Sequence, residues 1–271
     1  MRYRLNKRLM AMQPDETLQD GDCLVEVVGK KEYWDQYNKL VQDHMLMRSL
    51  NQAQYCKVDL LHTCDIGTFV IPDKKHILKK VKIFGYYMDK EKLIFIDDHG
   101  SVEELLNDIE KNQILEKTYV AHLFFEFLET LVKDDVSFLQ DYEENLMGME
   151  EQIMSGKVGS RQIPGEILKI RRELSRLCAY YTQLMNLGCS LSENYNNLLS
   201  PEECNLFHLF SDRVTRLVDQ TKELKDYALQ IREMHQTSLD EKQNNAISFL
   251  TVVTTIFMPL TLIAGWYGMN F

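Results

Sequence analysis

The chain has 271 residues, and its 31 basic and 41 acidic side chains give a net charge of −10 at pH 7. Apolar residues make up 45% and charged residues 27% of the sequence, which argues against a disordered protein. A nucleic-acid-binding protein needs a basic surface, so we expect no nucleic-acid partner. The six cysteines show no C-x-x-C spacing, and no apolar run typical of a signal peptide follows the basic N-terminus. We therefore expect a reduced, cytosolic setting for most of the chain.

Residues 1–100 predict an α/β domain. The periodicity of Lys31–Leu50 predicts a helix, and Asp65–Gly67 and Asp89–Lys90 predict turns. Neither G-x-G-x-x-G nor a Walker A pattern occurs, so the sequence gives no support for a phosphate-binding glycine loop. Five β-rich runs predict strands whose order stays open: Cys23–Val28, Tyr55–Leu61, Thr68–Ile71, Val81–Met88 and Leu93–Asp97.

Residues 101–200 predict an acidic helical region. Ser101 with Glu104 predicts a capping box at its start, and helical periodicity follows over about 117–155 and from Pro164 to about Leu191. Within 101–155, three lysines stand against fourteen acidic residues, a net charge of −11. This charge has two interpretations, namely a solvated helical face or a set of hard oxygen ligands for Mg²⁺.

Residues from Pro201 onward predict one very long helix. Ser200 supplies a cap, Pro201 occupies the first helical position, and Glu203 completes a capping box. A helix from Pro201 to about Ala264 would be about 96 Å long at 1.5 Å per residue. Its first part, a stalk over 201–242, carries an apolar seam with heptad spacing: Val214, Leu217, Thr221, Leu224, Ala228 and Ile231.

Residues 243–271 predict a membrane span that continues the stalk. These residues include no charged side chain, and about 20 apolar residues suffice to cross a bilayer. Trp266 and Tyr267 near the far end suit an interfacial aromatic belt. On a helical wheel, bulky apolar residues share one face, and threonine, methionine and glycine share the other. Such a stripe is consistent with helix packing through small residues or with the lining of a pore.

The end of the span carries a recognisable motif. Residues 267–271 read Tyr-Gly-Met-Asn-Phe, and Leu250-Thr251 and Met258-Pro259-Leu260-Thr261 precede them. Together they resemble the signature of the CorA family of divalent-metal transporters. The likeness in architecture extends over the chain, as an α/β head, acidic helices, a stalk and a first span. The implied fold class is an α/β N-terminal cytosolic domain plus long helices, in a pentameric funnel whose stalk helix enters the membrane.

The resemblance implies a homopentamer in the inner (plasma) membrane, with most of the chain in the cytosol and two spans per subunit. This sequence ends after the first span, so we expect a shortened form of a two-span parent. The implied selectivity loop is Gly268, Met269 and Asn270, with Asn270 as the selectivity residue. An apolar constriction at Ile247, Leu250 and Met258 would gate by excluding water. The implied pore-lining positions are Asn244, Ile247, Leu250, Thr254, Met258, Thr261 and Gly265.

The resemblance also implies that Mg²⁺ bound between subunits on the cytosolic side closes the pore. No spacing motif selects the ligands, so the candidates are the acidic helices and one pair at a strand end. These candidates are Asp97, Asp98, Glu126, Glu129, Asp134, Asp135, Asp141, Glu143, Glu144, Glu150 and Glu151.

The expected function is Mg²⁺ transport, with Mg²⁺ as cargo and regulator and with Co²⁺ or Ni²⁺ as alternative ions. A Zn²⁺ transporter of the ZntB branch is the nearest alternative, and a membrane-anchored scaffold that oligomerises through its stalk is the alternative from another class. The expected partners are further copies of the chain, membrane lipid and divalent cations. Scattered histidines and the lack of a nucleophile elbow argue against an enzyme.

Overall fold

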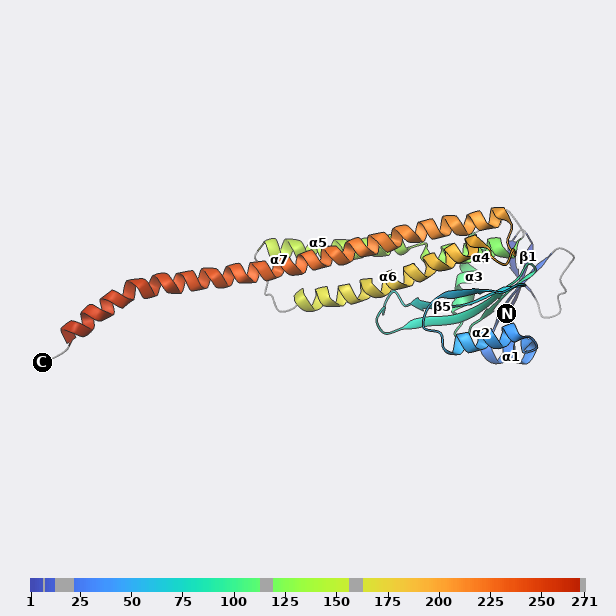
Figure 1. Cartoon of the computed structure of the whole chain (residues 1–271), viewed down its shortest axis with the longest axis horizontal. Coiled ribbons are helices and arrows are strands. Elements are labelled where there is room, and N and C mark those ends of the chain that lie inside the picture. Colours follow the sequence, from blue (N-terminus) through green and yellow to red (C-terminus); the bar gives the residue numbers. More distant parts are fainter. Residues whose placement is uncertain (7, 13–21, 113–118, 156–162, 269–271) are drawn as a thin grey trace.

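A computed structural model describes residues 1–6, 8–12, 22–112, 119–155 and 163–268. An α/β head lies at one end of an elongated molecule (Figure 1). The helices α6 (Ile163–Glu193) and α7 (Pro201–Gly268) run antiparallel and side by side along the head, and α7 then continues alone toward the C-terminus.

The head contains a seven-stranded mixed sheet in the order β2-β1-β3-β7-β6-β5-β4. The pair β3 and β7 is parallel, and the other neighbours are antiparallel. The strands are β1 (Arg2–Asn6), β2 (Arg8–Ala11), β3 (Cys23–Val28), β4 (Lys57–Leu60), β5 (Asp65–Pro72), β6 (Val81–Met88) and β7 (Lys92–Ile96).

Two features of the sheet differ from the prediction. The basic N-terminal residues form β1 and β2, because Tyr3 and Leu5 alternate with basic and polar side chains and are buried. The predicted turn at Asp65–Gly67 is wrong, since β5 begins at Asp65 and the chain reverses at 61–64. Gly67 belongs in this strand because a Cβ atom there would lie 2.2 Å from the Lys57 carbonyl oxygen.

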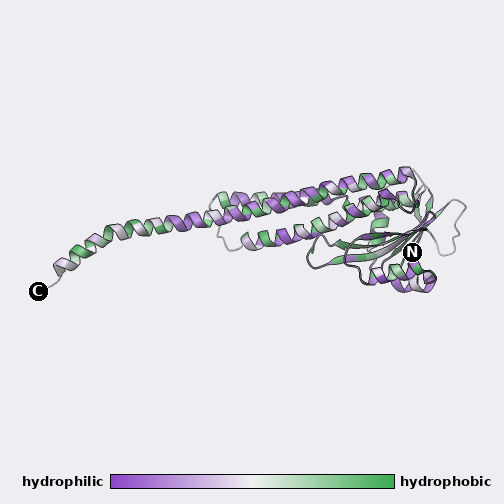
Figure 2. Cartoon of the chain, in the orientation of Figure 1, coloured by the Kyte–Doolittle hydropathy of each residue, from purple (hydrophilic) through white to green (hydrophobic). Residues whose placement is uncertain are grey.

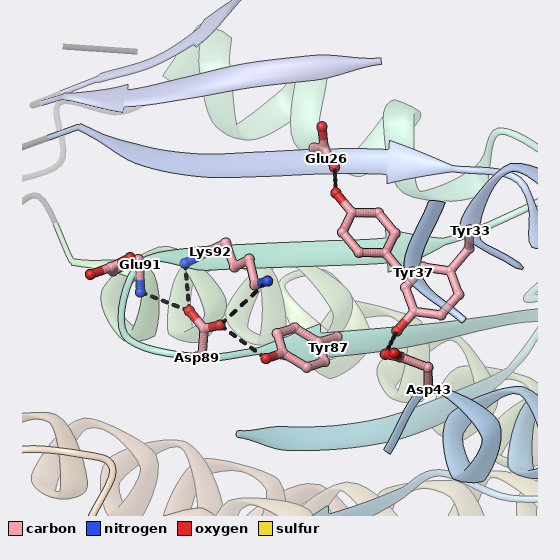
Figure 3. A network of polar contacts seen from close by, with 8 residues as sticks. All are labelled: Glu26, Tyr33, Tyr37, Asp43, Tyr87, Asp89, Glu91 and Lys92. Atoms are coloured by element: carbon pink, nitrogen blue, oxygen red, sulfur yellow. Dashed lines mark hydrogen bonds and ion pairs between the residues drawn. The ribbon is translucent and has the colours of Figure 1, made fainter. Parts of the chain in front are cut away.

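The predicted turn at Asp89–Lys90 is confirmed, and its side-chain contacts are drawn in Figure 3. The Asp89 carboxylate accepts hydrogen bonds from the backbone amides of Glu91 and Lys92, each at 2.9 Å. Such side-chain acceptance of nearby amides is why aspartate favours turns. The Lys92 ammonium lies 5.0 Å from the centre of the Tyr87 ring, which adds a cation–π contact beside the turn.

One face of the sheet is covered by α1 (Lys30–Tyr37) and α2 (Val41–Asn51). The single helix predicted over 31–50 is therefore two, because the chain is extended at Leu40. Two tyrosine hydroxyls of α1 donate to buried carboxylates (Figure 3): Tyr37 to Glu26 of β3 at 2.5 Å, and Tyr33 to Asp43 of α2 at 2.8 Å. Burial and these carboxylates raise the pKa of both phenols, so the donors stay protonated at physiological pH.

The other face is covered by α3 (Ser101–Asn112), α4 (Val120–Val132) and the α6–α7 hairpin. Aromatic side chains fill this layer, and the rings of Phe95 and Phe127 lie 4.6 Å apart between β7 and α4. The run predicted over 117–155 contains two helices, α4 and α5 (Asp135–Met154), which are separated at Lys133 and Asp134. The capping box predicted at Ser101 is wrong, because α3 begins at Ser101 itself.

The prediction for the start of α7 is confirmed. Ser200 and Glu203 form the reciprocal capping box, with the Ser200 amide 2.7 Å from Glu203 Oε2 and the Glu203 amide 3.4 Å from Ser200 Oγ. All six residues of the heptad seam are buried, and they pack within one chain against α5 and α6. Thr221 satisfies its hydroxyl by donating to the Leu217 carbonyl oxygen at 2.6 Å.

The close approach of α6 and α7 depends on Gly188. A Cβ atom there would lie 3.0 Å from the Phe210 ring and 3.2 Å from the Phe207 carbonyl oxygen. We predict that Gly188→Ala lowers the free energy of unfolding by about 1–3 kcal/mol, because overpacking outweighs the gain in helix propensity.

Gly148→Ala provides the matched control, since a Cβ atom on α5 at that position meets nothing within 4 Å. This substitution should stabilise the chain by about 0.5–1 kcal/mol through helix propensity. Urea unfolding followed by circular dichroism measures both changes, and equal effects of the two substitutions would refute the close-packing argument.

Candidate functional site

The C-terminal part of α7 leaves the bundle and is exposed along almost all of its length. Residues 239–267 are exposed in the single chain apart from the half-buried Val253, and no charged side chain occurs after Lys242. The hydrophobic colouring of this segment stands out in Figure 2. Among the described residues, α7 is the one helix long and apolar enough to cross a membrane, and its most apolar window is 0% buried. The predicted span is therefore present as a helix with no partner in the single chain.

The predicted pore-lining positions all lie on this exposed part of α7. Thr254, Met258, Thr261 and Gly265 share one groove on the helix around Pro259. The Thr254 hydroxyl donates to the Leu250 carbonyl oxygen, and the Thr261 hydroxyl donates to that of Phe257, each at 2.8 Å. Both hydroxyl oxygens thus keep lone pairs free to accept hydrogen bonds from water.

Pro259 adds a further oxygen to the span. Proline has no amide hydrogen, so the Thr255 carbonyl loses the donor that a regular helix would give it four residues later. The Thr255 hydroxyl itself donates to the Thr251 carbonyl oxygen at 2.8 Å and leaves its own carbonyl oxygen available.

The predicted selectivity loop continues beyond this segment. Gly268 is the last residue of α7, and Met269 and Asn270 lie outside the described residues.

Three of the predicted cytosolic ligands line one cavity of about 990 Å³ between the head and the helices. Glu126 and Glu129 come from α4 and Asp134 from the α4–α5 junction. Asp73 and Asp108 line the same cavity, which brings its acidic side chains to five. Five basic side chains balance this formal charge: Lys74, Lys75, Lys82, Lys133 and Arg213. Arg213 of α7 pairs with Glu129, whereas Glu126 and Asp134 have no cation within ion-pair distance in the described part of the chain.

Four of the predicted ligands are engaged by partners within the chain. Asp97 caps α3, because its two carboxylate oxygens accept the amides of His99 and Val102, each at 2.8 Å. Glu129 pairs with Arg213, as above, and Glu150 accepts a hydrogen bond from the Tyr227 hydroxyl. The fourth is Asp135, which is buried and pairs with Lys74.

The remaining candidates face solvent in the single chain. Asp98 is exposed and accepts the Lys30 amide at 2.9 Å. The other exposed candidates lie along α5: Asp141, Glu143, Glu144 and Glu151. No group of three or more His, Cys, Asp or Glu side chains suited to hold a metal ion occurs within the residues that the structure describes.

The acidic helices have a basic counterpart that the motifs considered above do not include. Lys74, Lys75, Lys79 and Lys80 lie in the connection between β5 and β6, and Lys82 follows as the second residue of β6. This basic loop, residues 74–82, sits beside α4 and α5, where Lys74 also lies 5.8 Å from the centre of the Phe138 ring. A lysine run in so acidic a chain is the signal that would have revealed it.

The Lys74–Asp135 pair gives a testable consequence. Desolvation raises the pKa of the buried Asp135 carboxyl, while the Lys74 ammonium opposes that rise. Lys74→Ala leaves the buried carboxylate unpaired, so we predict a loss of about 2 kcal/mol in the free energy of unfolding at pH 7.5.

The loss should shrink as the pH falls, because protonation of Asp135 removes the unpaired charge. Adding Asp135→Asn to the Lys74→Ala chain should recover most of the stability at pH 7.5. Urea unfolding of both variants at pH 5 and pH 7.5 measures these effects, and an undiminished loss in the double variant would contradict the ion-pair assignment.

Comparison with known proteins places this arrangement in a family. The family model for the CorA-like Mg²⁺ transporter protein matches residues 71–271. The cobalt/magnesium transport protein CorA of Thermotoga maritima is 26% identical over 158 residues, which cover 58% of this chain and 44% of that protein. The zinc transport protein ZntB of Photorhabdus laumondii is 23% identical over 170 residues, 63% of this chain and 50% of that protein.

Solved structures show the same fold over the whole chain. The complete CorA magnesium transporter from Methanocaldococcus jannaschii superposes with a TM-score of 0.79 at 17% identity, over 100% of this chain and 87% of that one. The full-length CmaX structure gives a TM-score of 0.78 at 14% identity, over 100% of this chain and 86% of that one. The chain spans about half the length of the curated relatives it matches. It belongs to the CorA-like Mg²⁺ transporter family of membrane proteins.

Proposed function

We propose that the chain is a pore-forming subunit of a homopentameric Mg²⁺ transporter in the plasma membrane, with its head and helical bundle in the cytosol. One observation carries this proposal: α7 runs unbroken from the head through an uncharged span to Gly268, the first residue of the Gly-Met-Asn motif. A single helix of 68 residues thus connects the head mechanically to the span. The family to which the chain belongs supports a divalent cation as the cargo.

The exposed face of α7 supports a particular arrangement of the copies. The buried seam is already used within one chain, so neighbouring copies must meet α7 through its other face. That face carries acidic residues at seven-residue intervals, all of them exposed: Asp212, Asp219, Asp226, Glu233 and Asp240. We refer to these five residues as the acidic stripe. In a parallel bundle they form successive rings of carboxylates, which concentrate divalent cations along the axis.

Mg²⁺ should stabilise such an assembly, because like charges repel across the rings and a divalent cation relieves the repulsion. We predict that Mg²⁺ raises the thermal midpoint of the detergent-solubilised oligomer above its value in EDTA. The double variant Asp226→Asn/Glu233→Gln should have a higher midpoint in EDTA and a smaller gain from Mg²⁺.

The exposed Glu166 at the start of α6 lies outside the acidic stripe, so Glu166→Gln is the control and should keep the full gain. Identical midpoints of the unmodified oligomer in EDTA and in excess Mg²⁺ would eliminate a cation-stabilised assembly.

The regulatory ions have a narrower set of candidate ligands than the sequence alone suggests. Asp97, Glu129, Asp135 and Glu150 are occupied by contacts within the chain. The other candidate carboxylates are partly or fully exposed, which suits Mg²⁺ held through its water shell between copies. These ligands are Asp98, Glu126, Asp134, Asp141, Glu143, Glu144 and Glu151. Closure of the pore by cytosolic Mg²⁺ would act on α7, since α7 is the element shared by the bundle and the span.

We assign recognition of the transported ion to Asn270. The Gly-Met-Asn motif and the chemistry of its side-chain amide both support this assignment. Mg²⁺ dehydrates reluctantly, so a pore that removed its whole shell would impose a large entry barrier. A ring of neutral amide oxygens accepts hydrogen bonds from the bound waters and recognises the hydrated ion by size. Within the span, the threonine hydroxyl oxygens and the Thr255 carbonyl oxygen would provide further acceptors for hydrogen bonds from the waters of the hydrated ion. The alternative is that Asn270 only ends a helix, as asparagine often does.

Measurement of Mg²⁺ uptake into proteoliposomes distinguishes these two roles of Asn270. Asn270→Ala should reduce Mg²⁺ uptake by the transporter at least tenfold while leaving its oligomeric mass unchanged, because the amide is the proposed recognition group for the ion. Asn270→Gln is the control, since it keeps the amide and should retain part of the uptake. Normal uptake by an assembled Asn270→Ala protein would overturn the assignment.

The same assay distinguishes the two alternative functions. A relative named for zinc transport supports Zn²⁺ as the second candidate cargo. Uptake of Zn²⁺ in preference to Mg²⁺, when both are supplied, would favour that function. A scaffold would give no uptake of either ion, nor of Co²⁺ or Ni²⁺, from a correctly assembled oligomer.

A further inference from the structure

A buried carboxylate lies under the turn that connects α6 to α7. Asp65 is the first residue of β5 and has no exposed surface. Its Oδ1 atom accepts a hydrogen bond from Asn196 Nδ2 at 2.7 Å, whereas Oδ2 is buried with no hydrogen-bond partner in the described part of the chain. A buried ionised carboxylate normally needs several donors, so one donor leaves this group poorly satisfied when it is charged.

Asn196 is the residue that ties the turn to the head. Its amide also donates to the Leu61 carbonyl oxygen at 2.7 Å, so one side chain holds both ends of the β4–β5 hairpin. Asn194 and Asn197 on either side have left-handed backbones, with φ of 48° and 54°, which keeps the turn tight. The connection matters because α7, the helix that enters the span, begins four residues after Asn197.

We propose that Asp65 and Asn196 form a proton-operated latch that holds the α6–α7 turn against the head. When Asp65 is neutral, the contact buries no charge, and the Asn196 amide is matched to a carboxyl oxygen. When Asp65 is ionised, the closed latch buries a charge with a single donor, and lifting of the turn lets water reach the carboxylate. The latch rests on the contacts above, and only its consequence for the pore rests on the proposed function.

Among the described residues, no cation compensates the charge of an ionised Asp65. Desolvation raises the pKa of Asp65 from 3.8 to about 6, and the Asn196 hydrogen bond offsets part of that rise. On β4, the neighbouring Asp59 pairs with Lys57 at 2.5 Å, and β6 contributes the neutral phenol of Tyr86.

In the described part of the chain, the other elements packed here bring no Lys or Arg side chain to Asp65. The β4–β5 hairpin contributes the buried Cys64 thiol and the exposed His62. The α6 side chain Gln183 is uncharged and accepts the Cys56 amide at the other end of β4. On the opposite face of the sheet, α2 presents Leu46 and Leu50. Because the closed state binds the proton more tightly than the open state, closure is favoured as the pH falls and lost as the pH rises through about 6.

Hydrogen exchange of the turn amides in the full chain tests the latch. After correction for intrinsic rates, exchange over residues 194–200 should be about tenfold faster at pH 7.5 than at pH 5.0, given carboxyl pKa values of about 6 when closed and 3.8 when open. Asp65→Asn, which keeps the shape without the charge, should show slow exchange at both pH values. Asp59→Asn on the adjacent strand is the control and should exchange like the unmodified chain.

The second variant, Asn196→Ala, keeps the carboxyl and removes the tie, so its turn should exchange fast at both pH values. If Asp65→Asn keeps the pH dependence of the unmodified chain, or if Asn196→Ala exchanges as slowly as the unmodified chain at pH 5.0, the latch is refuted. The readout involves no ion flux, so its failure is distinct from a failure of the transport proposal.

Discussion

The packing of α7 against α5 and α6 within one chain is the interaction on which the rest of the structure depends. Six seam residues are buried there, and each large apolar side chain among them contributes roughly 1.5–3 kcal/mol relative to exposure. Gly188 lets the two helices approach closely enough for Phe207 and Phe210 to fill the gap. This packing aligns α7 with the head, so the exposed span becomes a rigid extension of the folded part.

The same packing separates the two faces of α7 by chemistry. The apolar seam is covered by the chain's own helices, and the acidic stripe remains exposed on the other side. A helix with this distribution can hold its own subunit together and still present carboxylates to neighbouring copies. The acidic residues of 101–155 differ from the acidic stripe, because some of them have partners within the chain. These partners are Lys74, Arg213 and hydrogen-bond donors. Divalent-cation binding is therefore expected of the exposed carboxylates alone.

Much of the fold follows from local patterns in the sequence. The capping box at Ser200, the length of α7 and the uncharged span were predictable because each depends on residues close together in the chain. The failures have tertiary causes. Gly67 is typical of a turn by local propensity, but it lies in a strand because Tyr86 and the Lys57 carbonyl approach it. Ser101 is typical of a helix N-cap, but the Asp97 carboxylate instead accepts the hydrogen bond from the Val102 amide in the first turn of α3.

The candidate site was predictable only in part, for the same reason. The span and its motif are contiguous, so the sequence alone located them. The partners of the acidic residues come from distant segments, and Arg213 and Tyr227 could not be matched to Glu129 and Glu150 without the structure. The heptad spacing also left open which face of the stalk is buried within the chain. The assignment of the acidic stripe to the inner wall of an oligomer follows only after the seam is seen to be occupied.

The most direct test of this account is disulfide cross-linking between copies through the exposed face of α7. In a background without the six native cysteines, Asp226→Cys on the acidic stripe should yield disulfide-linked dimers in membranes under oxidation, since one cysteine per chain can join two neighbouring copies. Lys169→Cys, on the exposed surface of α6, should remain monomeric under the same conditions. A monomeric Asp226→Cys chain, or equal cross-linking at both positions, would contradict the proposal that the acidic face of α7 lines the ion pathway.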